Sequence, residues 1–255
     1  MKKITRHIPN ALTCTSLAFG FYASILGLSG DYFGAMIAIF IAAVFDFTDG
    51  FAARMLKAYS PMGKELDSLS DMVSFGVAPA MMLFCFIDNL LHDCTSWLDM
   101  SYMRELVLLS AFAIPILSAL RLAKFNIDER QKTSFIGLPV PAHAIFWASL
   151  IAALSPSHAD TYMNNCKFFD SIINIQPDIL IIILSVLAII SSLLLVSNIP
   201  MFSLKISSFG WKEAKLQYIL IISAIILVSF LGIIGISATI LLYILLSAFT
   251  KKSEP

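Results

Sequence analysis

The chain has 255 residues, of which 58% are hydrophobic and only 13% are charged. This composition is too apolar for an ordinary soluble domain and indicates a membrane protein. Lys and Arg together number 17, as do Asp and Glu, so the formal net charge is zero and no basic excess indicates a nucleic-acid partner.

Apolar runs long enough to cross a bilayer recur through the chain. A transmembrane helix needs about 20 apolar residues, and eight runs approach that length. The expected spans are residues 10–28, 32–56, 67–88, 105–123, 137–155, 178–197, 215–231 and 233–250. The first is interpreted as a retained span, and the last two require a helix break between Gly232 and Gly235. The sequence predicts an all-α integral membrane protein, a bundle of about eight transmembrane helices.

The positions of the basic residues predict the orientation of this bundle. An even number of spans places both termini on one side, and Lys and Arg are concentrated on the cytoplasmic side of membrane proteins. With a cytoplasmic N-terminus, all 17 basic residues except Arg104 and Lys167 fall on the cytoplasmic side. We expect both termini to be cytoplasmic, with a six-helix core in residues 1–200 and two additional helices in residues 201–255.

Four aspartates lie in the second and third expected spans and the turn between them. Asp46 and Asp49 are three residues apart, and Asp67 and Asp71 are four apart, so each pair shares a helix face. Helices joined by a short turn are antiparallel neighbours, which brings the four carboxylates together near the cytoplasmic membrane surface. Like charges in such a cluster repel unless a cation lies between them. Oxygen ligands without His or Cys favour Mg²⁺ or Mn²⁺ over Zn²⁺, and two ions are plausible.

Neighbouring residues suit a phosphate-bearing ligand at this cluster. Gly50 and Gly63 would allow close approach to the backbone, and Arg54 could donate to phosphate oxygens. The alternative is that the acidic groups are solvated or paired with Lys57, Lys64 or Arg54. The residues alone indicate an ion site and leave transport and catalysis both open.

The same segment resembles a known family signature. It reads Asp46-x-x-Asp49-Gly50-x-x-Ala53-Arg54, followed after eight residues by Gly63-x-x-x-Asp67-x-x-x-Asp71. Every fixed position is similar to the signature of the CDP-alcohol phosphatidyltransferases. The resemblance implies metal binding by the aspartates, Asp46, Asp49, Asp67 and Asp71, with Asp71 also acting as general base. It implies that the remaining signature residues line the cytidine diphosphate site or allow close helix packing around it: Gly50, Ala53, Arg54 and Gly63.

Three further stretches resemble the phosphatidylserine synthase branch of that family. They are Ile8-Pro-Asn10-x-x-Thr13, Arg121-Leu-Ala-Lys124-Phe-Asn126, and Ser134-Phe-Ile-Gly-Leu-Pro-Val-Pro-Ala142. Candidate groups for a serine acceptor are Arg121 and Lys124, which could hold its carboxylate, and the amide of Asn126. The basic side chains could instead contact anionic lipid headgroups. His143 departs from the small residue expected at its position.

The resemblance implies transfer of a phosphatidyl group from CDP-diacylglycerol to L-serine, which yields phosphatidylserine and CMP. The expected partners are these two substrates and membrane lipids, with no nucleic acid and with a homodimer as a possibility. The alternatives are the same chemistry with glycerol 3-phosphate or an inositol phosphate, a membrane cation transporter, or a structural membrane protein. We expect an active site that faces the cytoplasm.

Overall fold

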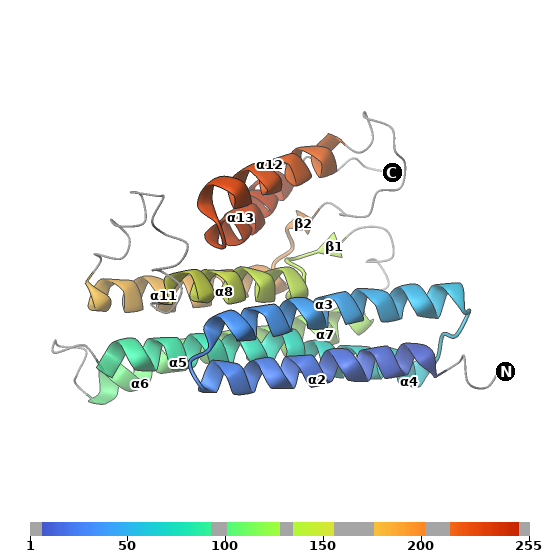
Figure 1. Ribbon diagram of the computed structural model, residues 1–255, viewed down its shortest axis with the longest axis horizontal. Helices are drawn as coiled ribbons and strands as arrows, with labels where there is room; N and C mark the ends of the chain where they lie inside the picture. The colour runs from blue at the N-terminus through green and yellow to red at the C-terminus, as the bar shows by residue number, and fades with distance from the viewer. Residues whose placement is uncertain (1–6, 93–100, 128–134, 156–175, 202–214, 250–255) are drawn as a thin grey trace.

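The computed structural model describes residues 7–92, 101–127, 135–155, 176–201 and 215–249, and these residues are almost entirely helical (Figure 1). The helices are α2 (Ile8–Leu28), α3 (Tyr32–Met55), α4 (Pro61–Asp71), the π-helix η1 (Met72–Val77), α5 (Ala78–His92), α6 (Ser101–Leu109), the 3₁₀ turn η3 (Ser110–Phe112), α7 (Ala113–Ile127), α8 (Val140–Leu154), α11 (Pro177–Val196), α12 (Lys215–Leu231) and α13 (Ile234–Phe249). Strands β1 (Phe135–Ile136) and β2 (Pro200–Met201) form one short antiparallel pair.

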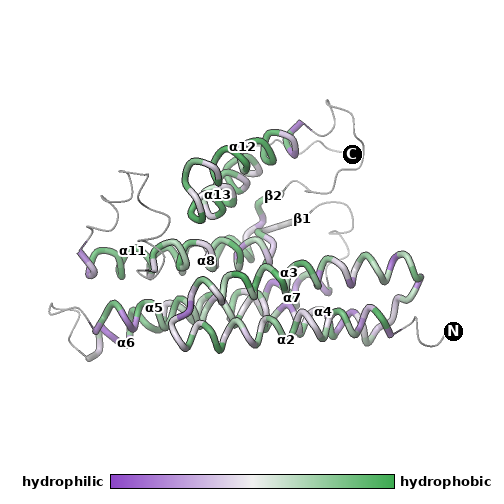
Figure 2. Tube along the Cα trace, in the orientation of Figure 1, coloured by the Kyte–Doolittle hydropathy of each residue, from purple (hydrophilic) through white to green (hydrophobic). Residues whose placement is uncertain are grey.

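An apolar helical segment occurs at each of the eight expected positions, which confirms the all-α membrane class. Five are long and apolar enough to cross a bilayer: Ile8–Leu28, Tyr32–Met55, Pro61–His92, Tyr102–Ile127 and Pro177–Val196. The other three, α8, α12 and α13, are shorter. Figure 2 shows hydrophobic residues along most of these helices. The number of spans, the side of the termini and the division at residue 200 stay predictions.

Local chemistry explains where several helices begin and end. The Asp31 side chain caps α3 by accepting a hydrogen bond from the Gly34 amide at 2.9 Å. Ser60 caps α4 in the same way, accepting from the Gly63 amide at 2.9 Å, and Pro61 occupies the first helical position. The expected break near Gly232 is confirmed, because this glycine has φ +62° between α12 and α13.

Helix α2 packs closely against its neighbours through small residues. Ser16 Oγ donates to the Ala42 carbonyl of α3 at 2.9 Å, and Ser74 Oγ of η1 donates to the Ser16 carbonyl at 3.1 Å. A Cβ added at Gly20 would overlap the backbone of Ser74. Lipid tails are as apolar as the helix side chains, so the hydrophobic effect does not drive helices together in a bilayer. Close packing of small residues and interhelical hydrogen bonds hold them together instead. This packing sets the position of α3 relative to η1.

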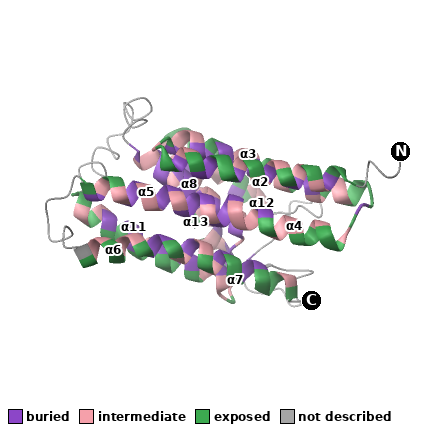
Figure 3. Ribbon diagram, turned by 90° about the horizontal axis from the view of Figure 1, so that it is seen from below, coloured by how far each residue is buried: buried purple, intermediate pink, exposed green. Residues whose placement is uncertain are grey.

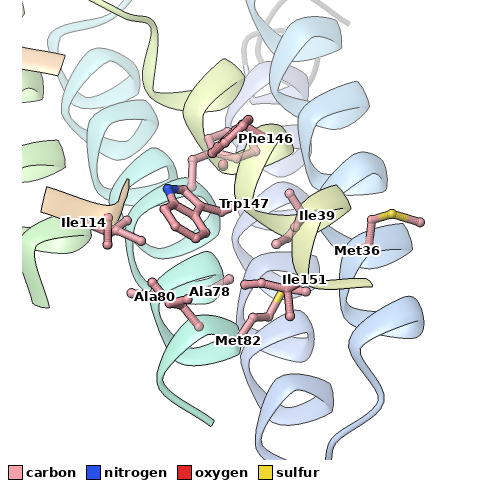
Figure 4. Packing of buried hydrophobic residues seen from close by; sticks show 14 of the residues in the cluster. Met36, Ile39, Ala78, Ala80, Met82, Ile114, Phe146, Trp147 and Ile151 are labelled. Carbon is pink, nitrogen blue, oxygen red and sulfur yellow. The ribbon is translucent and has the colours of Figure 1, made fainter. Parts of the chain in front are cut away.

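Helix α8 lies at the centre of the bundle. In Figure 3 the buried residues gather along α5 and α8. Trp147 is fully buried, and its indole lies among Ile114, Ala78 and Ile39, which come from three other helices (Figure 4). The outward faces of the bundle instead carry large apolar side chains, as a lipid-facing surface requires, among them Phe21, Ile116, Ile183 and Phe230.

Candidate metal and active site

Three aspartates from α3 and α4 converge beside α2, which packs against both helices. One carboxylate oxygen from each of Asp46, Asp49 and Asp67 lies within 4.8 Å of the others. Asp49 is buried and the other two are half-buried. Three carboxylate oxygens at this separation suit a hard divalent cation, so this donor set fits Mg²⁺ or Mn²⁺. The predicted convergence of the two helix faces is therefore seen for these three residues.

Asp71 lies beside this group at the end of α4. Its carboxyl group is within hydrogen-bonding reach of that of Asp46. One of its oxygens, Oδ1, is buried and makes no hydrogen bond to the described residues. The chain continues directly into the π-helix η1, an irregularity that is frequent at functional sites. Asp71 thus presents an unpaired oxygen next to the three-aspartate group, as a proton acceptor or an additional ligand requires.

Helix α2 orients one of the three clustered aspartates. The buried Thr13 hydroxyl donates to Asp49 Oδ2 at 2.5 Å, and the Pro9 carbonyl is a longer, competing acceptor at 3.0 Å. Ser70 Oγ of α4 donates in turn to the Thr13 carbonyl at 3.2 Å. These bonds connect α2 to α3 and to α4 at the level of the carboxylates. In the sequence Thr13 is only one position of a stretch that resembles the family, and its partner Asp49 lies 36 residues away.

The other signature residues surround the end of α3 and the start of α4. Gly50 and Ala53 are half-buried, whereas Arg54 is exposed. The Arg54 guanidinium lies over Gly50, since a Cβ built on Gly50 would be 3.7 Å from Arg54 Nη1. A Cβ built on Gly63 would lie 3.1 Å from Asn10 Oδ1 of α2, which is a close helix contact. The expected close packing at Gly63 is present, and nucleotide binding by Gly50, Ala53 and Arg54 stays a prediction.

The three residues expected to bind serine occupy different environments. Arg121 is buried, donates from Nε to the Leu138 carbonyl at 2.8 Å, and interacts electrostatically with Asp71. Lys124 is exposed. Asn126 donates to Ser68 Oγ of α4 at 2.8 Å, so its amide joins α7 to α4. Arg121 and Asn126 are thus both linked to α4, Arg121 through the charge of Asp71 and Asn126 through its hydrogen bond to Ser68.

His143 belongs to a buried polar cluster between α8 and α11. Its Nε2 lies 3.0 Å from Ser191 Oγ, and Trp147 Nε1 donates to both His143 Nε2 and Ser191 Oγ at 3.1 Å. The imidazole is fully buried. His143 is larger than the small residue expected at its position, and it is accommodated by hydrogen-bonding partners within the bundle. The sequence pattern does not indicate these partners.

Comparisons with known proteins give matches over much of the chain. The family model described as CDP-alcohol phosphatidyltransferase matches residues 6–176. CDP-diacylglycerol–serine O-phosphatidyltransferase of Bacillus subtilis is 36% identical over 135 residues, which are 53% of this chain and 70% of the relative. The protein of that name in Methanocaldococcus jannaschii is 38% identical over 121 residues, 48% of this chain and 52% of the relative.

A third relative is named for a related product. Archaetidylserine synthase of Methanothermobacter thermautotrophicus is 33% identical over 148 residues, which are 56% of this chain and 58% of the relative. The chain therefore spans little more than half the length of the two archaeal relatives. The four aspartates, Arg121 and the segment before α8 all lie within the residues that the family model matches.

Proposed function

Because the chain belongs to the CDP-alcohol phosphatidyltransferase family, we propose that it transfers the phosphatidyl group of CDP-diacylglycerol to the hydroxyl of L-serine. The products are phosphatidylserine and CMP. The observation that carries the chemistry is the group of three carboxylate oxygens within 4.8 Å, with Asp71 beside it. The serine acceptor is supported by the names of the relatives and by the buried cation Arg121, which interacts electrostatically with Asp71.

All four aspartates would be metal ligands, and Asp71 would also be the base. Asp46, Asp49 and Asp67 would hold divalent cations, Mg²⁺ or Mn²⁺, with Asp71 completing a two-ion site. When bound, such ions neutralise the diphosphate and stabilise the departing phosphate oxygen. Thr13 keeps Asp49 in the ligating orientation through its hydrogen bond.

Asp71 would accept the proton of the serine hydroxyl. The serine oxygen then forms a new bond to the lipid-linked phosphorus, the bond from that phosphorus to the CMP oxygen breaks, and CMP leaves with the electron pair. The buried, unpaired Oδ1 of Asp71 supports this role, since a base needs a free oxygen directed toward the reacting group.

The cationic residues would bind the two substrates from different helices. Arg121, at the cluster, would hold the serine carboxylate through a charge-assisted hydrogen bond, and the acceptor hydroxyl would then lie toward Asp71. Arg54, exposed at the end of α3, would contact the diphosphate. The basic residues Arg54, Lys57 and Lys64 near this end of the bundle support a site that opens to the cytoplasm.

Purified protein incubated with CDP-diacylglycerol, Mg²⁺ or Mn²⁺, and one acceptor at a time tests this function. The acceptors are L-serine, glycerol 3-phosphate and an inositol phosphate, and both CMP and the lipid product are measured. We expect CMP release that requires serine and the metal and yields phosphatidylserine. Product formation with a phosphorylated acceptor alone would overturn the serine assignment, and absence of CMP with every acceptor would overturn the transferase assignment.

A further inference from the structure

Two long helical segments carry the candidate base and the candidate acceptor cation. The first, Pro61–His92, consists of α4, η1 and α5, and the second, Tyr102–Ile127, consists of α6, η3 and α7. At one end of this pair, Arg104 Nη2 of α6 donates to Asp88 Oδ1 of α5 at 2.7 Å, which forms an ion pair. The polar contact at the opposite end joins α7 to α4 and lies next to the aspartates.

Asn126 makes the contact between α7 and α4. Its side-chain Nδ2 donates to Ser68 Oγ at 2.8 Å, and its backbone carbonyl accepts from Lys64 Nζ at 3.2 Å. Ser68 Oγ also donates to the Lys64 carbonyl at 3.3 Å, which completes a small network. Ser68 directly follows Asp67, one of the three clustered aspartates. The end of α7 is therefore attached to α4 at the level of the candidate metal site.

A further contact between the same two segments fixes their register. A Cβ built on Gly76 of η1 would lie 3.4 Å from Ser118 Cβ of α7, so the two helices are in close contact at this point. Gly76 lies eight residues after Ser68, and Ser118 lies eight residues before Asn126. Equal steps in opposite directions are what two antiparallel helices in register require.

Asp71 and Arg121 lie between these two contacts, one on each segment. The register therefore places the candidate base opposite the stretch of α7 that carries the guanidinium, in agreement with the electrostatic interaction of the two groups. The Leu138 carbonyl holds Arg121 from the side of α8. The hydrogen bond of Asn126 restrains the end of α7 beyond Arg121, so this end of the helix stays next to α4.

We infer that Asn126 is a positioning residue, whose hydrogen bond to Ser68 keeps Arg121 in register with Asp71, and that its amide does not itself hold serine. The acceptor has to reach Arg121 with its carboxylate and Asp71 with its hydroxyl at the same time. These two groups come from different helices, so a shift of α7 along α4 would spoil the geometry. The inference rests on the proposed function and deepens it.

The aspartates have an attachment that does not depend on Asn126. Helix α4 is fixed to α2, where Ser70 Oγ donates to the Thr13 carbonyl at 3.2 Å and Gly63 packs against Asn10. Loss of the Asn126 amide should therefore loosen α7 while the metal ligands stay in place. The expected signature is weaker use of serine with unchanged use of metal.

Asn126→Ala and Ser68→Ala test the inference because they remove the same hydrogen bond from its two ends. Loss of one neutral hydrogen bond corresponds to about a two- to ten-fold change in affinity, so each variant should raise the KM for serine by that factor. The KM for CDP-diacylglycerol and the metal concentration for half-maximal rate should not change. The double variant should resemble either single variant. Ser68→Thr keeps the hydroxyl and should stay close to wild type.

Asp88→Ala is the matched control on the same pair of segments. It removes the ion pair with Arg104 at the end away from the aspartates, so it should lower Tm without a selective rise in the serine KM.

The Ser68→Ala variant separates positioning from direct contact. A serine KM that rises in Asn126→Ala alone would make Asn126 a serine ligand and overturn the inference, as would an unchanged serine KM in both single variants or additive effects in the double variant. The Tm of each variant is measured without substrate, and additive losses of Tm would also overturn the inference because they would exclude a shared hydrogen bond. A wild type that makes no phosphatidylserine overturns the proposed function, whereas the Tm values decide the hydrogen bond separately.

Discussion

Thr13→Val should selectively lower the affinity for the metal ion, because it removes the hydroxyl that orients Asp49. Both side chains are buried, Thr13 at 3% exposure and Asp49 at 5%, so water cannot readily replace the lost donor. The valine methyl fills nearly the same space, and the main loss is the 2.5 Å hydrogen bond to Asp49 Oδ2. A hydrogen bond to a charged group contributes about 1.5–3 kcal/mol.

This energy converts directly into an expected change in metal affinity. At about 1.4 kcal/mol for each factor of ten, the Mg²⁺ or Mn²⁺ concentration for half-maximal rate should rise roughly ten- to a hundred-fold, the range typical of residues that orient a metal ligand. The measurement is a metal titration of CMP release at saturating substrates. Thr13→Ser keeps the hydroxyl and should stay close to wild type.

Thr15→Val is the matched control on the same helix. Thr15 is half-buried, and its hydroxyl donates to the Ala11 carbonyl of its own helix at 2.9 Å, so no metal ligand depends on it. Its metal titration should superpose on that of the wild type. If the Thr13→Val titration also superposed on wild type, with an unchanged Tm, Thr13 would not orient a metal ligand and the role given to Asp49 would lose its support.

Three further substitutions test the proposed base, the proposed serine contact and the packing of α2. Asp71→Asn should lower kcat by about 10²- to 10⁴-fold while CDP-diacylglycerol still binds, and near-normal turnover would exclude Asp71 as the base. Arg121→Ala should raise the serine KM roughly ten- to a hundred-fold, with partial recovery in Arg121→Lys; a rise confined to the donor KM would identify a diphosphate ligand instead. Gly20→Ala should lower Tm by overpacking against Ser74, at a cost on the order of 1–3 kcal/mol, and Gly27→Ala, whose Cβ meets a flexible methionine side chain at 3.1 Å, should lower it less.

Local features of the sequence were sufficient for the helices and for the acidic cluster. Apolar length predicts each helical segment, because a bilayer imposes the same requirement on every span regardless of its neighbours. The break before α13 follows from Gly232, which adopts φ +62° at low cost. Asp46, Asp49 and Asp67 converge because spacing within each helix and a short connection between helices already determine their common face.

Tertiary packing decided which of the remaining polar residues act together. Thr13 reaches Asp49 across 36 positions, and Arg121 is held by a carbonyl 17 residues away. His143 lies beside Ser191, which is 48 residues away in the sequence. Hydropathy and periodicity describe one helix at a time, whereas these contacts depend on how helices cross, and small residues such as Gly20 set those crossings. For that reason the sequence determined the acidic cluster, and only the assembled bundle decided which side chains contact it.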